Sequence, residues 1–128
     1  MKPFPYLVNF LEKQNIEIAI VSNSDYNFIN NQLIKSNLKK YFKSKNIISC
    51  SKILKAKPKP DGYIKAIKQL KKNINNIVVI EDSENGITAA KKANISKILR
   101  FTNCNLNISK KIIHKDVKNL KSYKELLK

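Results

Sequence analysis

Five polar residues of complementary kinds stand where apolar or proline-stiffened stretches of the sequence end. They carry a hydroxyl, an amide, an ammonium group and two carboxylates, on Ser22, Asn23, Lys57, Glu81 and Asp82. Hydrogen-bond donors and a cation neutralise the oxygens of a phosphoryl group, whereas carboxylate oxygens are the ligands that magnesium prefers. Magnesium in such sites takes one or two protein carboxylates and completes its shell with water and phosphate. The set therefore favours a site for a phosphoryl group beside a divalent metal.

Each of these residues also has a common structural role. A Ser-Asn pair often ends a strand and begins a turn, so Ser22 and Asn23 need no ligand. Lys57 is one lysine among many, and its neighbouring prolines can simply keep a solvated connection extended. Asp82 or Ser83 can be the N-cap of a following helix. The chemical interpretation depends on their joint occurrence in this order.

The elements that must position these residues follow from hydrophobic periodicity. Short apolar runs predict strands, at Ile18–Val21, Ile47–Ile48, Ile77–Ile80 and Ile95–Phe101, with a weaker candidate at Ile112–Ile113. Helical spacing predicts helices, at Pro5–Gln14, from an Asp25 N-cap to about Asn37, at Asp61–Leu70, through Ile87–Ala93 and at Leu120–Leu127. Strands that alternate with helices in this way are typical of an α/β fold with a doubly wound parallel sheet.

In an open α/β sheet, ligands bind beyond the carboxyl ends of the strands. Ser22 and Asn23 directly follow one predicted strand, and Glu81 and Asp82 directly follow another. We therefore expect these side chains to share one edge of the sheet. The second helix should bury one stripe of apolar side chains, made of Phe28, Ile29, Leu33 and Ile34, and Tyr41 and Phe42 should dock after its end.

Three stretches of the sequence, VSNS, AKPKPDGY and VVIEDSENGITAAKKA, occur in the order of three family motifs. The chain resembles the haloacid dehalogenase superfamily in its second, third and fourth motifs, in the branch of β-phosphoglucomutase-like and phosphoglycolate-phosphatase-like proteins. The resemblance spans essentially the whole chain. It implies a three-layer Rossmann-like core with a parallel sheet, within a single partial domain over residues 1–128.

The resemblance also implies a role for each matching residue. Ser22 would hydrogen-bond the transferring phosphoryl group with help from Asn23, and Lys57 would balance charge on the nucleophile and phosphate, so that Ser22 and Lys57 are the catalytic candidates. Lys57 fits better than Lys59, because the family places its lysine directly before the first proline. Asp82 would ligate Mg²⁺, with Glu81 in support. The implied activity is magnesium-dependent phosphatase or phosphomutase chemistry on a phosphorylated small molecule.

The sequence departs from the family at its amino-terminal motif. Family members begin with a strand that ends in DxDxT or DxDxV, whose first aspartate is the nucleophile, followed by a helical cap. No such motif is present here, and the acidic residues before Ser22 are Glu12 and Glu17. We therefore expect a core that lacks its first central strand and its cap, and a chain that is inactive alone. A missed upstream start, an amino-terminal half supplied in trans and a decayed remnant all remain open.

The charge of the chain suggests a different class of partner but supports it weakly. A formal net charge of +17 comes from 26 basic and 9 acidic residues, and Arg100 is the only arginine. Nucleic-acid surfaces usually use arginine for bidentate contacts, and the joint excess of lysine, asparagine and isoleucine is what an AT-rich coding sequence produces. We expect salt-sensitive attraction to polyanions, without specific nucleic-acid recognition.

The remaining features argue for a cytoplasmic protein without a membrane segment. Cys50 and Cys104 lie far apart without metal-ligand spacing, and the amino terminus lacks the apolar run of a signal peptide. His114 and Tyr123 have no partner nucleophile in the sequence, so surface or packing roles are expected. A non-catalytic binding or interaction module, or a split-enzyme subunit, is the alternative to an enzyme core.

Overall fold

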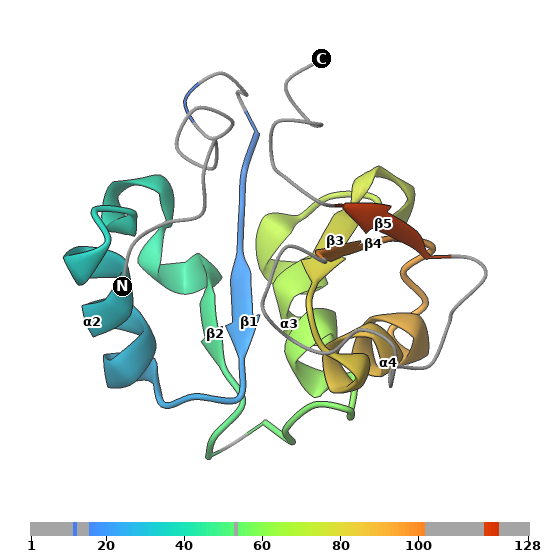
Figure 1. Cartoon of the computed structure of the whole chain (residues 1–128), viewed down its shortest axis with the longest axis horizontal. Coiled ribbons are helices and arrows are strands. Elements are labelled where there is room, and N and C mark those ends of the chain that lie inside the picture. The colour runs from blue at the N-terminus through green and yellow to red at the C-terminus, as the bar shows by residue number, and fades with distance from the viewer. Residues whose placement is uncertain (1–11, 13–15, 53, 102–116, 121–128) are drawn as a thin grey trace.

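A computed structural model of the chain describes residues 12, 16–52, 54–101 and 117–120. Its main helices are α2 (Tyr26–Lys35), α3 (Asp61–Leu70) and α4 (Glu84–Lys92), and short 3-10 turns are η1 (Lys39–Tyr41), η2 (Ser44–Asn46) and η3 (Ile74–Asn76). Strands alternate with helices along the chain, from β1 (Ile20–Ser22) to β5 (Lys118–Leu120). The α/β class predicted from the sequence is confirmed (Figure 1).

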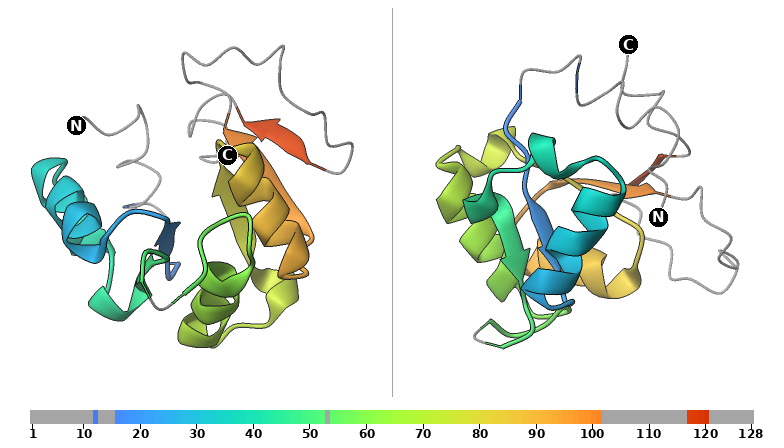
Figure 2. Two further views of the ribbon diagram at one scale, coloured as in Figure 1. Left: turned by 90° about the horizontal axis from the view of Figure 1, so that it is seen from below. Right: turned by 90° about the vertical axis from the view of Figure 1, so that its left-hand side faces the viewer.

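The described strands form two parallel sheets rather than one. In the first, β1 pairs with β2 (Ile47–Ser49). In the second, β3 (Val78–Glu81), β4 (Lys97–Phe101) and β5 lie in that order. Within the described part of the chain, β1 and β3 each pair with a strand on one side only, and no strand lies between them. The left view of Figure 2 shows β1 apart from β3.

The sheet of β1 and β2 has a helix on each face, which gives this half three layers. Successive residues of a strand point to opposite faces. Accordingly, Ile20 and Ile47 pack with the buried side chains of α2, whereas Val21 and Ile48 face α3. Tyr41 and Phe42 pack against the α2 side, as the sequence predicted.

The sheet of β3, β4 and β5 carries the other large core. Val79 and Ile98, on one face of this sheet, pack against α4, whose buried apolar residues include Ile87, Ala89 and Ala90. Small alanine side chains let the helix approach the sheet closely, and these three residues have no exposed surface. This half of the molecule is therefore tightly packed.

Helix α3 connects the two halves. On one side it contacts β1 and β2, where Gly62 lies so close that an added Cβ would stand 2.4 Å from Cys50 Sγ and 2.6 Å from Val21 Cγ1. On the other side, Tyr63 belongs to the same apolar cluster as Val79 of β3. Helix α3 therefore packs against elements of both halves, although no described strand links β1 with β3 (Figure 1).

Several sequence predictions need correction. In α2 the buried stripe is narrower than expected, because Ile29 and Leu33 are buried whereas Phe28 and Ile34 are 56% and 53% exposed. The sequence analysis expected four apolar residues to be buried. However, β2 and the turn η1 cover only the face of α2 that carries Ile29 and Leu33. The first strand, predicted at Ile18–Val21, begins at Ile20 and ends at Ser22, and its residues are half-buried.

Other predictions lie outside the described residues. These are the helix at Pro5–Gln14 apart from Glu12, the strand candidate Ile112–Ile113, the helix after Leu120, and the residues Cys104, His114 and Tyr123. Leu120 itself ends β5, which the sequence analysis did not predict. Among the described helices, none has the length and apolar character needed to cross a bilayer.

Candidate active site

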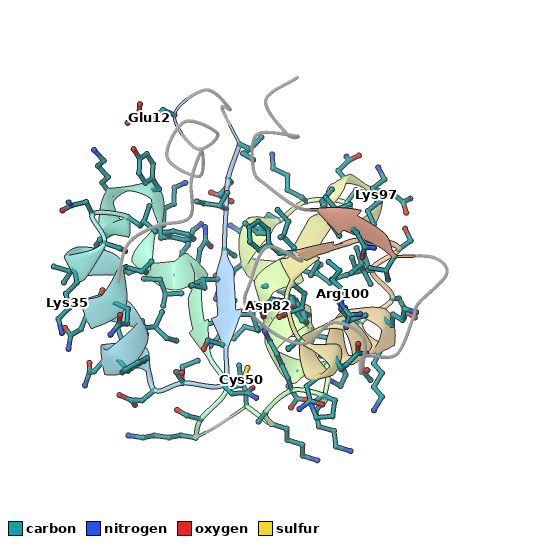
Figure 3. The ribbon with its side chains drawn as sticks, viewed as in Figure 1. Glu12, Lys35, Cys50, Asp82, Lys97 and Arg100 are labelled. Carbon is teal, nitrogen blue, oxygen red and sulfur yellow. The ribbon has the colours of Figure 1, made fainter. Side chains whose placement is uncertain are left out.

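The predicted site residues lie at the carboxyl ends of β1 and β3. Ser22 is the last residue of β1 and Glu81 the last of β3, while Lys57 comes from the connection between β2 and α3. Asp82 follows β3 directly and is labelled in Figure 3. The structure brings Asn23, Lys57 and Glu81 into direct contact.

Asn23 holds the backbone of Lys57 on both sides. Its Oδ1 accepts a hydrogen bond from the Lys57 N–H at 2.8 Å, and its Nδ2 donates to the Lys57 carbonyl oxygen at 3.4 Å. A primary amide matches one backbone N–H and one backbone C=O at once, since it offers an acceptor and a donor side by side. The Asn23 side chain thereby fastens the proline-rich connection to the end of β1.

Glu81 holds the other end of Lys57. The Lys57 Nζ lies 2.6 Å from Glu81 Oε2, and the two side chains are only 11% and 8% exposed. Taking two charges out of water is costly, so such a pair persists only with close geometry and further hydrogen bonds. The ion pair of Lys57 and Glu81 is therefore a buried part of the site rather than a solvent-exposed surface contact.

Further donors complete the environment of the Glu81 carboxylate. The Tyr63 hydroxyl donates to the same Oε2 that Lys57 contacts, and Oε1 accepts from the Asp82 N–H at 3.2 Å and from Ser83 Oγ at 3.3 Å. Lys57 Nζ also lies 5.2 Å from the centre of the Tyr63 ring. Burial, and then the charge of Glu81, raise the pKa of the Tyr63 phenol far above its usual range, so it stays a neutral donor.

The first turn of α4 fits closely against Glu81. A Cβ added at Gly86 would lie 1.9 Å from Glu81 Cδ, so no larger residue fits there without a shift. Ser83 is the N-cap of this helix, because its Oγ accepts from the Gly86 N–H at 3.1 Å. Of the two residues considered for the cap, Ser83 fills it, which leaves the Asp82 side chain outside the helix.

Ser22 lies in a turn that is braced from β2. Its Oγ accepts from the Ser24 N–H at 3.1 Å, and Ser49 Oγ donates to the Ser24 carbonyl oxygen at 2.6 Å. A hydroxyl that accepts one hydrogen bond still has a proton to donate. Ser22 can therefore offer that proton to an anion at this edge while its orientation is held by the turn.

The donor set fits a magnesium ion that is shared with phosphate. Among the described residues, no group of three or more histidine, cysteine or acidic side chains could enclose a metal. Magnesium beside a phosphate needs only one or two protein carboxylates, and Asp82 offers an exposed one next to the buried Lys57 and Glu81 pair. Asp82 would hold the ion, with water and phosphate filling the remaining positions.

Two contributors were not found from the sequence. Tyr63 lies in the helix predicted at Asp61–Leu70 and is 7% exposed, but nothing in the periodicity showed where its hydroxyl would point. Arg100, the only arginine, pairs with Glu84 in the first turn of α4 and so ties β4 to the helix that supports Glu81. A single arginine in a lysine-rich chain was the available signal, since arginine suits buried ion pairs better than lysine.

Comparison with known proteins gives consistent relatives. Residues 2–99 match the family model described as haloacid dehalogenase-like hydrolase. Two curated relatives are a phosphorylated carbohydrates phosphatase of Thermotoga maritima, 28% identical over 71% of this chain and 41% of that protein, and a bifunctional riboflavin kinase/FMN phosphatase of Arabidopsis thaliana, 33% identical over 68% of this chain and 23% of that protein. The chain thus spans less than half the length of either relative.

Solved structures agree with this match. A HAD hydrolase of family IA, variant 3, from Entamoeba histolytica has a TM-score of 0.83 and 26% identity, covering 97% of this chain and 56% of that one. A HAD family hydrolase from Deinococcus radiodurans, with bound phosphate and sodium, has a TM-score of 0.72 and 25% identity, covering 93% of this chain and 53% of that one. These values support the Rossmann-like arrangement of the described elements.

Proposed function

This chain belongs to the haloacid dehalogenase-like hydrolase family, and we propose that its site binds the phosphate of a phosphorylated small molecule for magnesium-dependent phosphoryl transfer, as in a phosphatase or phosphomutase. One observation carries the proposal: Lys57, on a loop, is fixed at the carboxyl ends of β1 and β3 by Asn23 and Glu81. A lysine held so firmly at the ligand-binding edge of an α/β sheet has a positional role that a solvated lysine lacks.

The residues of this chain divide the work of binding the phosphate. The Lys57 ammonium offsets negative charge on the phosphate oxygens, and the Ser22 hydroxyl donates a hydrogen bond to one of them. Asp82 would hold a magnesium ion, and that ion would neutralise charge on the phosphoryl group. Because Ser22 and Lys57 are held in place before the substrate arrives, little reorganisation of these two groups is needed as charge develops during transfer.

The nucleophile, in this proposal, comes from a segment outside these 128 residues. The sequence contains no Asp-x-Asp motif, and covalent phosphoryl transfer of this kind needs a carboxylate at the sheet edge. In the described residues, β1 and β3 each have an unpaired edge, and α3 packs against both. A parallel strand of an amino-terminal half, supplied in trans or by a longer polypeptide, would pair with both edges and bring an aspartate beside Lys57.

The phosphate-binding part is tested by NMR on the full 128-residue chain labelled with ¹⁵N. Titration with inorganic phosphate in the presence of Mg²⁺ is expected to shift the amide signals of Ser22, Lys57 and Asp82. Lys57→Met should weaken phosphate binding by about tenfold, the loss expected for one charge-assisted hydrogen bond. Lys59→Met is the matched control, because this exposed lysine lies two residues away in the same loop. Shifts scattered over the lysine-rich surface, unchanged in Lys57→Met, would contradict the proposal.

The external nucleophile is tested in two ways. We expect no magnesium-dependent hydrolysis of para-nitrophenyl phosphate by the purified chain, and hydrolysis that disappears in Asp82→Ala would overturn this part of the proposal. Translation of the genomic DNA that precedes the Met1 codon, in every frame, should reveal an apolar strand followed by Asp-x-Asp. Finding neither feature would count against a longer polypeptide as its source.

A further inference from the structure

We propose that Asn23, Tyr63 and Glu81 are positioning residues that hold Lys57 from both ends, and that Glu81 serves Lys57 rather than the metal. Their contacts stand by themselves, whereas their importance for phosphate rests on the proposed function. Asn23 fixes the Lys57 backbone, and Glu81 with Tyr63 fixes its ammonium group. The sequence alone assigned Asn23 to phosphate and Glu81 to magnesium.

The acceptor capacity of Glu81 is used inside the protein. An ionised carboxylate has about four lone-pair sites on its two oxygens. Here Oε2 receives Lys57 and Tyr63, and Oε1 receives the Asp82 N–H and Ser83 Oγ. A metal bound to Glu81 would have to displace one of these donors from a side chain that is 8% exposed. The Asp82 side chain, by contrast, lies at the surface.

Tyr63 keeps the carboxylate aimed at the lysine. Its hydroxyl donates to the same oxygen as Lys57, while its ring packs with Val79 and lies next to the Lys57 ammonium. Gly86 closes the opposite side, since the backbone of α4 approaches Glu81 within the space of one methyl group. Glu81 is thus enclosed between α3 and α4, with Lys57 as its charged partner.

Asn23 completes the arrangement from the backbone side. Both polar atoms of its amide are engaged with Lys57, at 2.8 Å and 3.4 Å. A carboxylate at this position could accept from the Lys57 N–H, but its second oxygen would face the Lys57 carbonyl oxygen without a proton between them. Asn23→Asp therefore tests the pairing with almost no change of shape.

The experiment measures how fast each lysine of the full chain is acetylated by a trace of acetic anhydride, with tandem mass spectrometry resolving Lys57 from Lys59. In the unmodified protein we expect Lys57 to react about tenfold more slowly than Lys59, since its amine is engaged by a charge-assisted hydrogen bond. Tyr63→Phe, which keeps the ring, should speed Lys57 acetylation about threefold, and Asn23→Asp should also speed it. Glu81→Gln should speed it about tenfold.

The Lys59 rate should stay constant in every variant, which separates a local effect from loss of the fold. If Glu81→Gln alters the circular dichroism spectrum, the isosteric Tyr63→Phe carries the test alone. Equal rates for Lys57 and Lys59 in the unmodified protein, or an unchanged Lys57 rate in Tyr63→Phe, would overturn the proposal. Slow Lys57 acetylation together with failure to bind phosphate would instead refute the proposed function and leave the positioning set standing.

Discussion

The two halves of the molecule are built from similar elements but are packed differently. In the half with β3 and β4, helix α4 brings Ile87, Ala89 and Ala90 to zero exposure against the sheet. In the half with β1 and β2, the sheet has helices on both faces, yet every residue of β1 is only half-buried. Because β1 and β3 each have one described strand neighbour, the difference comes from α4, whose small buried side chains pack against β3 and β4.

The difference explains where the site can be rigid. Glu81 and Ser83 belong to the well-packed half, whereas Ser22 and Asn23 belong to the other. The contacts of Lys57 with Asn23 and Glu81 cross between them. The relative position of the β1 side and the β3 side of the site therefore depends on α3 and on Lys57.

The largest effect is expected when one core side chain is truncated in each half, which tests directly whether the two halves differ in packing. Ile87→Ala, at a residue with zero exposure, should lower the free energy of unfolding by about 3–4 kcal/mol, because α4 cannot collapse into the cavity. Ile20→Ala in the half-buried β1 should cost about 1 kcal/mol. Urea unfolding followed by circular dichroism measures both values. Equal losses would contradict the difference in packing.

The two close glycine contacts should give the next largest effect. Gly86→Ala places a methyl group against Glu81 Cδ, and Gly62→Ala places one against Cys50 Sγ and Val21 Cγ1. We expect Gly86→Ala to cost about 2–3 kcal/mol, because the tightly packed half has little room to adjust, and Gly62→Ala to cost about 1 kcal/mol. The same urea measurement applies. Asn85→Ala, next to Gly86 but exposed, is the control.

Removal of the helix caps should give smaller losses of stability. Asp25 accepts from the Asn27 N–H at 3.1 Å at the start of α2, and Ser83 accepts from the Gly86 N–H at 3.1 Å at the start of α4. Asp25→Ala and Ser83→Ala should each lower stability by about 1 kcal/mol. Ser83→Ala also removes a donor from Glu81, so the cost should exceed that of Asp25→Ala. A larger loss in Asp25→Ala would show that β1 and α2 form the stiffer half.

The smallest expected effect is a change of thiol reactivity with pH. Burial raises the pKa of Cys50, at the end of β2, above its ordinary value of 9.0, and Asp61 raises it further while Lys57 opposes the shift (Figure 3). In a Cys104→Ser variant, iodoacetamide should therefore alkylate Cys50 more slowly at pH 8 than it alkylates a free thiol.

The same shift predicts a weak loss of stability at high pH. Because the folded state holds the Cys50 proton more tightly than the unfolded state, this stabilisation is complete below pH 9.0 and declines as the pH rises through the folded pKa. Unfolding curves of Cys50→Ala, compared with those of the unmodified chain between pH 8 and pH 10, measure the contribution. Rapid alkylation at pH 8 would show that α3 does not seal this half.

Sequence reasoning succeeded where one local pattern decided the structure. The helix at Asp61–Leu70 has the predicted bounds, because a proline-rich connection precedes it and its apolar spacing is strong. The transition from strand β3 to helix α4 was also predicted, with Ser83 as one of two possible N-cap residues. In α2, burial was predicted for two apolar residues that are exposed, because periodicity does not show how much of an apolar helix face a neighbouring sheet will cover.

The positions of four candidate residues relative to the strands were predicted, but the contacts among the candidates were not. Ser22 and Glu81 end β1 and β3, Asn23 and Asp82 follow them directly, and Lys57 comes from the connection between β2 and α3. Which side chain contacts which depends on separations across two sheets and on the approach of α4 at Gly86. The hydroxyl of Tyr63 illustrates this limit, because a residue counted as core also supplies a polar donor to a buried carboxylate.

By itself, therefore, the sequence determined the α/β class, the order of the elements and the five polar residues at the sheet edge, because period and turn chemistry act over a few neighbouring residues. Only the tertiary structure decided that β1 and β3 lie in separate sheets within the described residues, and that Lys57 is held by Asn23 at its backbone and by Glu81 at its ammonium. These contacts join residues 24 and 34 positions apart, and burial of the charged pair makes their geometry specific.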